Sequence, residues 1–218
     1  MNLSDFLFYR DDWATIYCGD CREILPMIEP VDLVLTDPPY GLNINYGTYE
    51  DTQPALQKLL SQIWPFIDAS APLKLLTPGV LNIHLYPKPT WIMVWTWEHT
   101  GTTGGWGFNQ WGPILCYGTD PYLKNGMGRQ LDVLRCQCLD IMQDGHPVPK
   151  PLFAWKRIML RASIRDGETI LDPFLGSGTT CVAAKNLNRK SIGIEIEPKY
   201  CEIAVKRLRQ EVFDFGVK

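Results

Sequence analysis

Apolar residues along the chain follow two spacings, one typical of buried strands and the other of amphipathic helices. Short apolar runs bounded by turn residues predict strands at 13–18, 31–36, 73–76, 91–97, 111–118, 170–172 and 191–196. Apolar residues three and four positions apart predict helices at 22–28, 55–67, 152–162, 179–187 and 198–208. Strands that alternate with helices favour a doubly wound α/β fold with helices on both faces of a mostly parallel sheet. The runs 91–97 and 111–118 have no helix between them and predict an antiparallel hairpin with a long tip.

The strand predicted at 31–36 ends in Asp37-Pro38-Pro39-Tyr40. The two prolines remove two backbone donors and fix φ twice, so the chain must leave the sheet in one rigid, extended shape. Ligands of open α/β sheets bind beyond the carboxyl ends of strands, where this corner lies. The Asp37 carboxylate and the Pro38 carbonyl can accept the two N–H donors of a planar amino group, and Tyr40 can stack on its ring. The structural alternative is a Pro-Pro turn with a helix-capping aspartate.

A second motif follows the strand that ends at Asp172, where Pro-Phe-Leu-Gly-Ser-Gly-Thr-Thr occupies 173–180. Its glycines allow a ligand to approach the backbone, and the amides at the start of the next helix would face that ligand. Dinucleotide-binding enzymes use similar turns, although their third glycine is missing here. Glu195 ends the next strand, at about the spacing from which an acid binds ribose hydroxyls. Its alternative role is to cap the helix that follows.

Together these motifs carry a family resemblance. Asp37–Tyr40 resembles the catalytic tetrapeptide of the DNA methyltransferases that transfer a methyl group from S-adenosylmethionine to adenine N6 or cytosine N4. The run 172–180 resembles the S-adenosylmethionine motif of the same family. Here the catalytic motif precedes the cofactor motif, and this circularly permuted order resembles that of the beta group. The resemblance implies a Rossmann-like, mostly parallel seven-stranded sheet with an antiparallel hairpin.

The resemblance also divides the single methyltransferase domain, residues 1–218, into three parts. These are a catalytic half at about 1–118, a short target-recognition segment at about 119–145 and a cofactor-binding half at about 146–218. Within the middle segment, Lys124, Arg129 and Arg135 are candidates to contact DNA. The alternative is a disordered connector. A recognition segment this short implies a short target site, a homodimer or low selectivity.

Several residues are expected at the cofactor by the same resemblance. It places Asp20 against the adenine ring, with capping of the helix that begins at Cys21 as the alternative. Lys150 would pair with the methionine carboxylate, Asp172 would face the cofactor's amino group, and Phe174 would pack on its face. The remaining candidates are Cys21, Gly176, Ser177, Gly178, Thr179 and Glu195.

Two further segments have open interpretations. Residues 41–54 are rich in Gly, Asn, Thr and Tyr, and directly follow the catalytic corner; they predict a mobile lid, with a plain surface loop as the alternative. The tryptophans between 91 and 111 fit either a base-stacking platform or a tryptophan-rich core, and the core is favoured for most of them.

Composition limits the remaining possibilities. A chain of 218 residues with 45% hydrophobic residues fits one globular domain. It has no apolar stretch of membrane-spanning length and no export signal, so a cytoplasmic location without membrane contact is expected. The seven irregularly spaced cysteines are expected to be reduced thiols, and their spacing does not suggest zinc. No metal is expected.

The net charge of −3 is unusual for a DNA-binding protein, but it is unevenly distributed. Residues 1–117 have five basic and twelve acidic side chains, whereas residues 150–218 have thirteen basic and eight acidic ones. Phosphate contacts would therefore come from the last third and from the three basic residues of the middle segment, unless these charges are ordinary solvated helix faces.

The function that this sequence predicts is methylation of a flipped base in double-stranded DNA. Asp at the first position of the tetrapeptide favours adenine N6 by family resemblance, because cytosine-N4 enzymes more often have Ser there. The alternatives are a cytosine-N4 enzyme, an RNA methyltransferase, or a non-catalytic DNA-binding protein that retains the fold.

Overall fold

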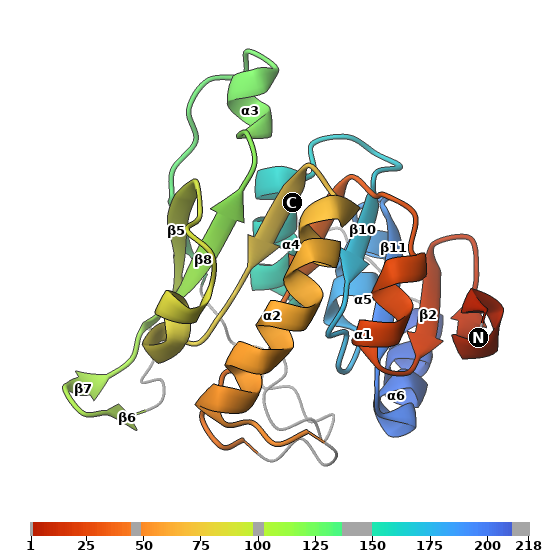
Figure 1. Ribbon diagram of the computed structural model, residues 1–218. Coiled ribbons are helices and arrows are strands. Elements are labelled where there is room, and N and C mark those ends of the chain that lie inside the picture. The colour runs from red at the N-terminus through yellow and green to blue at the C-terminus, as the bar shows by residue number, and fades with distance from the viewer. Residues whose placement is uncertain (1, 45–48, 98–102, 137–149, 211–218) are drawn as a thin grey trace.

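The computed structural model describes residues 2–44, 49–97, 103–136 and 150–210. A nine-stranded sheet forms the centre, with strand order β1-β2-β11-β10-β3-β4-β8-β5-β9 (Figure 1). The strands are β1 (Leu7–Arg10), β2 (Ala14–Cys18), β3 (Leu33–Thr36), β4 (Leu73–Leu76), β5 (Trp91–Thr96), β8 (Trp111–Tyr117), β9 (Val133–Arg135), β10 (Thr169–Asp172) and β11 (Lys190–Glu195). Two short strands, β6 (Thr103–Gly104) and β7 (Gly107–Phe108), form a separate hairpin.

Helices cover both faces of this sheet. They are α1 (Cys21–Ile24), α2 (Gln53–Ser70), α3 (Pro121–Lys124), α4 (Leu152–Ala162), α5 (Thr179–Asn186) and α6 (Pro198–Arg209), with 3₁₀ turns at η1 (Leu3–Phe6), η2 (Leu25–Met27) and η3 (Val80–Leu85). On β3, Leu33 and Leu35 pack with α4 and α5, whereas Val34 between them packs with α1 and α2. Because successive side chains of a strand point to opposite faces, one apolar run supplies both core layers.

Strand directions place the candidate motifs at one edge of the sheet. β2, β11, β10, β3 and β4 are parallel neighbours. β8 is antiparallel to both β4 and β5, so β5 runs in the direction of β3, as does β9. The term carboxyl edge denotes the side of the sheet that contains the C-terminal ends of these parallel strands. The β6–β7 hairpin projects from it, whereas α3 lies at the opposite edge (Figure 1).

The predicted fold class is confirmed, but the sheet has nine strands rather than about seven. The N-terminal lead-in contains β1, which pairs antiparallel with β2. The predicted recognition segment contains β9, which pairs with β5. β1 and β9 have only four and three residues, so neither is long enough to show a clear period.

The helix predicted at 55–67 is confirmed and is longer at both ends, because α2 begins at Gln53 and continues through Pro65 to Ser70. Pro65 is exposed, while Ile63 and Ile67 on either side of it are fully buried. Burial of Ile67 offsets the backbone hydrogen bond that the proline removes, since burying one such side chain contributes roughly 2 kcal/mol.

The tryptophans differ in their exposure to solvent. Trp95 is buried and its ring packs against that of Trp97, with centroids 4.7 Å apart. Trp91 and Trp106 are exposed instead.

No helix within the described parts of the chain is long and apolar enough to cross a bilayer.

Candidate active site

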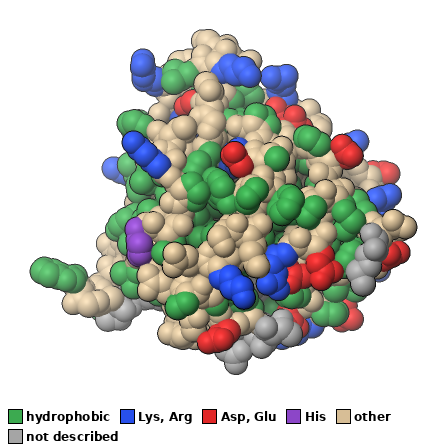
Figure 2. Space-filling model, in the orientation of Figure 1, with side chains coloured by type: hydrophobic (Ala, Val, Ile, Leu, Met, Phe, Trp, Pro, Cys, Tyr) green, Lys and Arg blue, Asp and Glu red, His purple; other side chains and the backbone are tan. Residues whose placement is uncertain are grey.

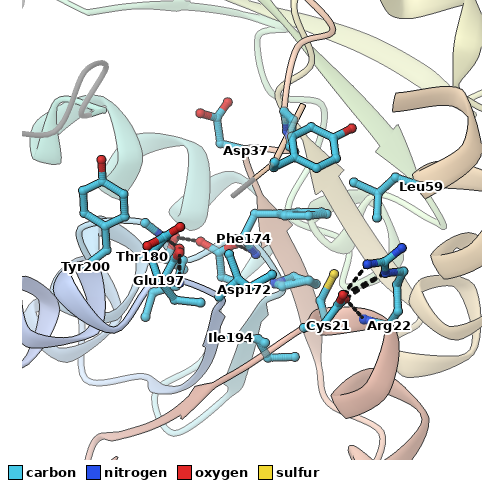
Figure 3. A pocket seen from close by; sticks show the side chains of 18 of the residues that line it. Cys21, Arg22, Asp37, Leu59, Asp172, Phe174, Thr180, Ile194, Glu197 and Tyr200 are labelled. Atoms are coloured by element: carbon cyan, nitrogen blue, oxygen red, sulfur yellow. Dashed lines mark hydrogen bonds and ion pairs between the residues drawn. The ribbon is translucent and has the colours of Figure 1, made fainter. Parts of the chain in front are cut away.

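Four acidic residues lie at the carboxyl ends of four adjacent strands: Asp20 after β2, Glu195 on β11, Asp172 on β10 and Asp37 after β3. All four line one pocket of about 360 Å³ (Figure 3). The two motifs, 135 positions apart between Asp37 and Asp172, therefore meet in a single cavity. The sequence-based prediction of one shared site requires the two motifs to lie together, and in the structure they do.

The pocket contains most of the predicted site residues. Its walls include Asp20, Cys21, Asp37, Pro39, Tyr40, Lys150, Asp172, Phe174, Gly176, Ser177, Thr179 and Glu195. Pro38 and Gly178 are buried and are absent from this lining. Figure 3 shows Phe174 extending across the cavity between Asp37 and Cys21. The structure thus brings these residues together, while their individual contacts with a ligand remain predictions.

Asp172 joins the two motifs through hydrogen bonds. Its Oδ1 accepts from Thr36 Oγ1 at 2.6 Å and from the Phe174 amide at 3.0 Å, and its Oδ2 accepts from Thr180 Oγ1 at 2.5 Å. Trp155 Nε1 donates in turn to Thr180 Oγ1 at 2.7 Å. Burial raises the pKa of Asp172 to about 6, because it penalises the charged form more than these donors stabilise it. Three of the chain's own donors therefore occupy the carboxyl group that was predicted to face the cofactor's amino group.

Glu195 supports the glycine turn. Its Oε2 accepts from the Gly176 amide at 2.8 Å, and its Oε1 accepts from the Glu197 amide at 2.9 Å, at the start of α6. Burial raises the pKa of Glu195. The N-cap residue of α6 is Glu197, so Glu195 supports the approach to that helix rather than capping it, and binding of ribose by the remaining lone pairs stays a prediction.

The glycine turn fits closely against α6. Gly178 has φ +86°, and a Cβ added there would lie 2.5 Å from the Cβ of Ala204. Arg207, also on α6, donates to the Ser177 carbonyl at 2.8 Å and to the Thr179 hydroxyl at 3.1 Å. These contacts explain why the turn needs glycine, and they fix the amides that open α5.

At the catalytic corner, every oxygen of the Asp37 carboxylate has a donor. Oδ1 accepts from Thr77 Oγ1 at 2.7 Å and from Tyr40 Oη at 2.9 Å. Lys150 Nζ donates to Oδ2 at 2.5 Å and also to Tyr40 Oη. Burial and the neighbouring Asp37 raise the pKa of Tyr40 well above its usual range, so its hydroxyl keeps its proton. Lys150, expected at the methionine end of a cofactor, contacts the catalytic carboxylate instead.

Residues that the sequence did not single out hold this corner in place. Asn82 Nδ2 donates to the Tyr40 carbonyl at 2.6 Å. A Cβ added at Gly79 would lie 3.2 Å from Tyr40, so the absence of a side chain there admits the tyrosine. Buried Asp51 accepts from the amides of Gly41 and Leu42 at 2.6 and 3.0 Å. The predicted lid 41–54 is thus tied back at its start, while its residues 45–48 lie outside the described part of the chain.

Asp20 and Cys21 follow β2 and form part of the pocket wall. The Asp20 side chain accepts from the Arg22 amide at 2.9 Å and pairs with the Arg22 guanidinium, so the predicted helix cap is confirmed. That pairing also lowers the pKa of Asp20. Burial, with Asp20 adding to it, raises the pKa of Cys21 to about 12, so the thiol is not a nucleophile.

The three basic candidates for DNA contact lie outside the pocket. Lys124 ends α3 at the edge opposite the catalytic corner, and exposed Arg129 follows α3 in the connection to β9. Neither belongs to the surface around Asp37, because β8 carries the chain to the far edge before α3 begins. Arg135 ends β9 and returns to the carboxyl edge. The part of the predicted recognition segment from 137 to 145 lies outside the described residues.

With this geometry established, comparison with known proteins becomes informative. A model of the N6/N4 DNA methylase family matches residues 57–206, which is more than half of the chain. The chain belongs to this family. Its members are amino DNA methyltransferases, as the resemblance of both motifs implied.

Individual relatives give the extent of this similarity. The Type II methyltransferase M.HpaI of Haemophilus parainfluenzae is 28% identical over 245 aligned positions, covering 92% of this chain and 76% of that protein. M2.DpnII of Streptococcus pneumoniae is 54% identical over 66 residues, which are 30% of this chain and 24% of M2.DpnII. The chain thus spans about a quarter of M2.DpnII in that match.

Two solved structures share the fold. The cytosine-N4-specific PvuII DNA methyltransferase aligns with a TM-score of 0.74 and 16% identity, covering 94% of this chain and 89% of that one. The M1.HpyAVI–S-adenosylmethionine complex aligns with a TM-score of 0.68 and 22% identity over 90% of this chain and all of that one. These alignments confirm the Rossmann-like fold.

Proposed function

We propose that this DNA methylase transfers a methyl group from S-adenosylmethionine to the exocyclic amino group of a base flipped out of double-stranded DNA, with adenine N6 as the target. The observation that carries the proposal is the shared pocket, in which the Asp37 corner faces the glycine turn. Family membership supports the reaction class, and Asp at the first position of the tetrapeptide supports adenine. Cytosine N4 is the competing target.

The residues of the pocket fit S-adenosylmethionine. Four carboxyl groups surround a cavity that would receive a cationic sulfonium, and Phe174 offers an aromatic face for the adenine ring. Backbone amides at the start of α5 and the acids Asp20 and Glu195 suit the hydroxyls and amino groups of a nucleoside. When bound, S-adenosylmethionine would supply a methyl group that is already activated by its sulfonium.

The chain's own contribution is to hold and orient the target amino group. Asp37 Oδ2 and the Pro38 carbonyl would accept its two N–H donors, which turns the nitrogen lone pair towards the glycine turn. Thr77 and the Tyr40 hydroxyl both donate to Oδ1, so the carboxylate is fixed before the base arrives. Such preorganised positioning and charge are the main sources of catalysis that this site offers.

DNA would approach the carboxyl edge, because the pocket opens there. The β6–β7 hairpin stands out from this edge, with Trp106 fully exposed and Phe108 62% exposed. Figure 2 shows hydrophobic side chains projecting from the molecule at the position of this hairpin. Exposed aromatic rings on the side of the sheet where the pocket opens can stack on bases or enter an opened step of the duplex. We therefore assign the hairpin to the DNA-facing surface.

The proposal is tested by incubating the protein with duplex DNA and methyl-tritiated S-adenosylmethionine. Incorporation of label that is lost in Asp37→Asn supports the reaction, and digestion to nucleosides identifies the base. Label in N6-methyl-2′-deoxyadenosine is the expected result. Label in N4-methyl-2′-deoxycytidine would replace the adenine assignment, and no incorporation with any duplex or RNA would refute catalysis.

A further inference from the structure

Lys150 occupies the position that a target amino group needs. Its ammonium donates to Asp37 Oδ2, and Thr77 and Tyr40 already occupy Oδ1. The Lys150 side chain is only 9% exposed, and that of Asp37 is 23% exposed. One acceptor site of Oδ2 remains, but a target amino group that used it would meet the buried ammonium, and the two positively polarised donors would compete for the same oxygen.

The backbone of Lys150 belongs to the other half of the pocket. Its carbonyl accepts from the hydroxyl of Thr179, the first residue of α5, at 3.5 Å. Lys150 therefore starts beside the glycine turn and extends its side chain to the catalytic corner. A flexible four-carbon stem lets the ammonium move within the pocket while the backbone stays in place. The ammonium is a compact point charge, so it can pair with any anion within its reach.

We propose that Lys150 is a latch, which pairs with Asp37 until a carboxylate in the cofactor half of the pocket draws the ammonium away. The proposed cofactor carries such a carboxylate on its amino-acid part, so the inference rests on the proposed function. Transfer of Lys150 to that carboxylate uncovers Asp37 Oδ2 for the target base. Cofactor binding and target binding then favour each other, because the first draws Lys150 away from Asp37 and the second gains when the ammonium no longer competes for Oδ2.

The latch makes a prediction that needs no DNA. Because cofactor binding must break the Lys150–Asp37 pair, that pair opposes cofactor binding. Removing the charge of Asp37 should therefore strengthen binding of a ligand that carries the carboxylate. It should not affect a ligand that lacks it.

Calorimetry with two ligands provides the test. S-adenosylhomocysteine carries the carboxylate, whereas 5′-methylthioadenosine has the same nucleoside without the amino-acid part. We expect Asp37→Asn to raise the affinity for S-adenosylhomocysteine about tenfold, the order of one charge-assisted hydrogen bond. Lys150→Met should lower that affinity by about the same factor, and in its background Asp37→Asn should have no further effect. Binding of 5′-methylthioadenosine should be unchanged in all variants.

Lys58 provides a matched control, because it is a second lysine in the pocket wall and is exposed. Lys58→Met should leave the ratio of the two affinities unchanged, and thermal melting of each variant confirms that it folds. Equal binding of S-adenosylhomocysteine by wild type and Asp37→Asn would overturn the latch but leave the cofactor assignment intact. A loss of carboxylate selectivity in Lys58→Met instead of Lys150→Met would also overturn it. Binding of neither ligand to the wild type would refute the cofactor assignment, and the latch with it.

Discussion

Replacing Asp172 by Asn should change the free energy of unfolding of this DNA methylase in a pH-dependent way. Relative to the wild type, the variant should be more stable at neutral pH than at acidic pH. Asp172 is 2% exposed and has a pKa of about 6 in the folded chain, against an ordinary value of 3.8. The unfolded chain therefore releases this proton first as the pH rises. Between pH 3.8 and 6 the folded state holds a proton that the unfolded state has lost, so stability falls with rising pH.

The size of the effect follows from the two pKa values. The difference between 3.8 and about 6 corresponds to about 3 kcal/mol of folding free energy, fully lost above the folded pKa. About 1 kcal/mol of it falls between pH 5 and pH 7. An asparagine carries no charge at either pH. The free energy of unfolding of the variant, relative to that of the wild type, should therefore rise by that amount between pH 5 and pH 7.

The assay is urea unfolding of both proteins at pH 5 and pH 7. Comparing the change with pH cancels any fixed cost of altered hydrogen bonds to Thr36 and Thr180. Asp120→Asn is the matched control: Arg161 lowers the pKa of Asp120 below 3.8, so its titration lies below pH 5 and the difference from wild type should be constant. A constant difference for Asp172→Asn as well would refute the reasoning.

Three further predictions concern the site and its surroundings. Asp37→Asn should reduce methyl incorporation into DNA by about 100-fold or more, since it removes a preorganised charge; a rate near that of the wild type would contradict its assignment. Gly178→Ala should lower the free energy of unfolding by roughly 3 kcal/mol, because the backbone has φ +86° and the new Cβ would meet Ala204 at 2.5 Å. Gly126→Ala, with φ +70° and open space, should cost only about 1 kcal/mol in the same urea titration, and equal losses would contradict the packing argument. Trp106→Ala should leave stability unchanged but weaken the affinity for duplex DNA about tenfold, measured by fluorescence anisotropy, if its ring stacks on a base; unchanged affinity would remove the hairpin from the DNA-facing surface.

The positions of the acids could be predicted from the sequence because they depend on a simple rule. Asp37, Asp172 and Glu195 each follow a short apolar run, and parallel strands end at a common edge. The rule fixes where a side chain starts but not what it contacts. It therefore placed these residues in one pocket without revealing that Thr36, Thr180 and Gly176 already bind two of the carboxylates.

The partner of Lys150 could not be predicted in this way. It lies 113 positions from Asp37, and a lysine beside a pocket with several possible anions has no sequence signal for its choice. The position of Lys124 depends on a different feature, since the direction of β8 decides on which edge α3 lies. The antiparallel pairing of β8 with β5 sets that direction. The position of the predicted recognition segment between the two halves of the chain does not.

The strand order has a consequence for how the chain folds as it is synthesised. Of the described strands, β10 and β11 come last in the chain, yet they sit between β2 and β3 and connect the two outer parts of the sheet. A growing polypeptide thus has one small and one larger group of strands, each with an unpaired apolar border, until the final βαβ unit enters between them. Such borders invite pairing with other chains. Release from the ribosome just short of β10 should therefore produce aggregates, whereas the finished chain closes both borders with a single insertion.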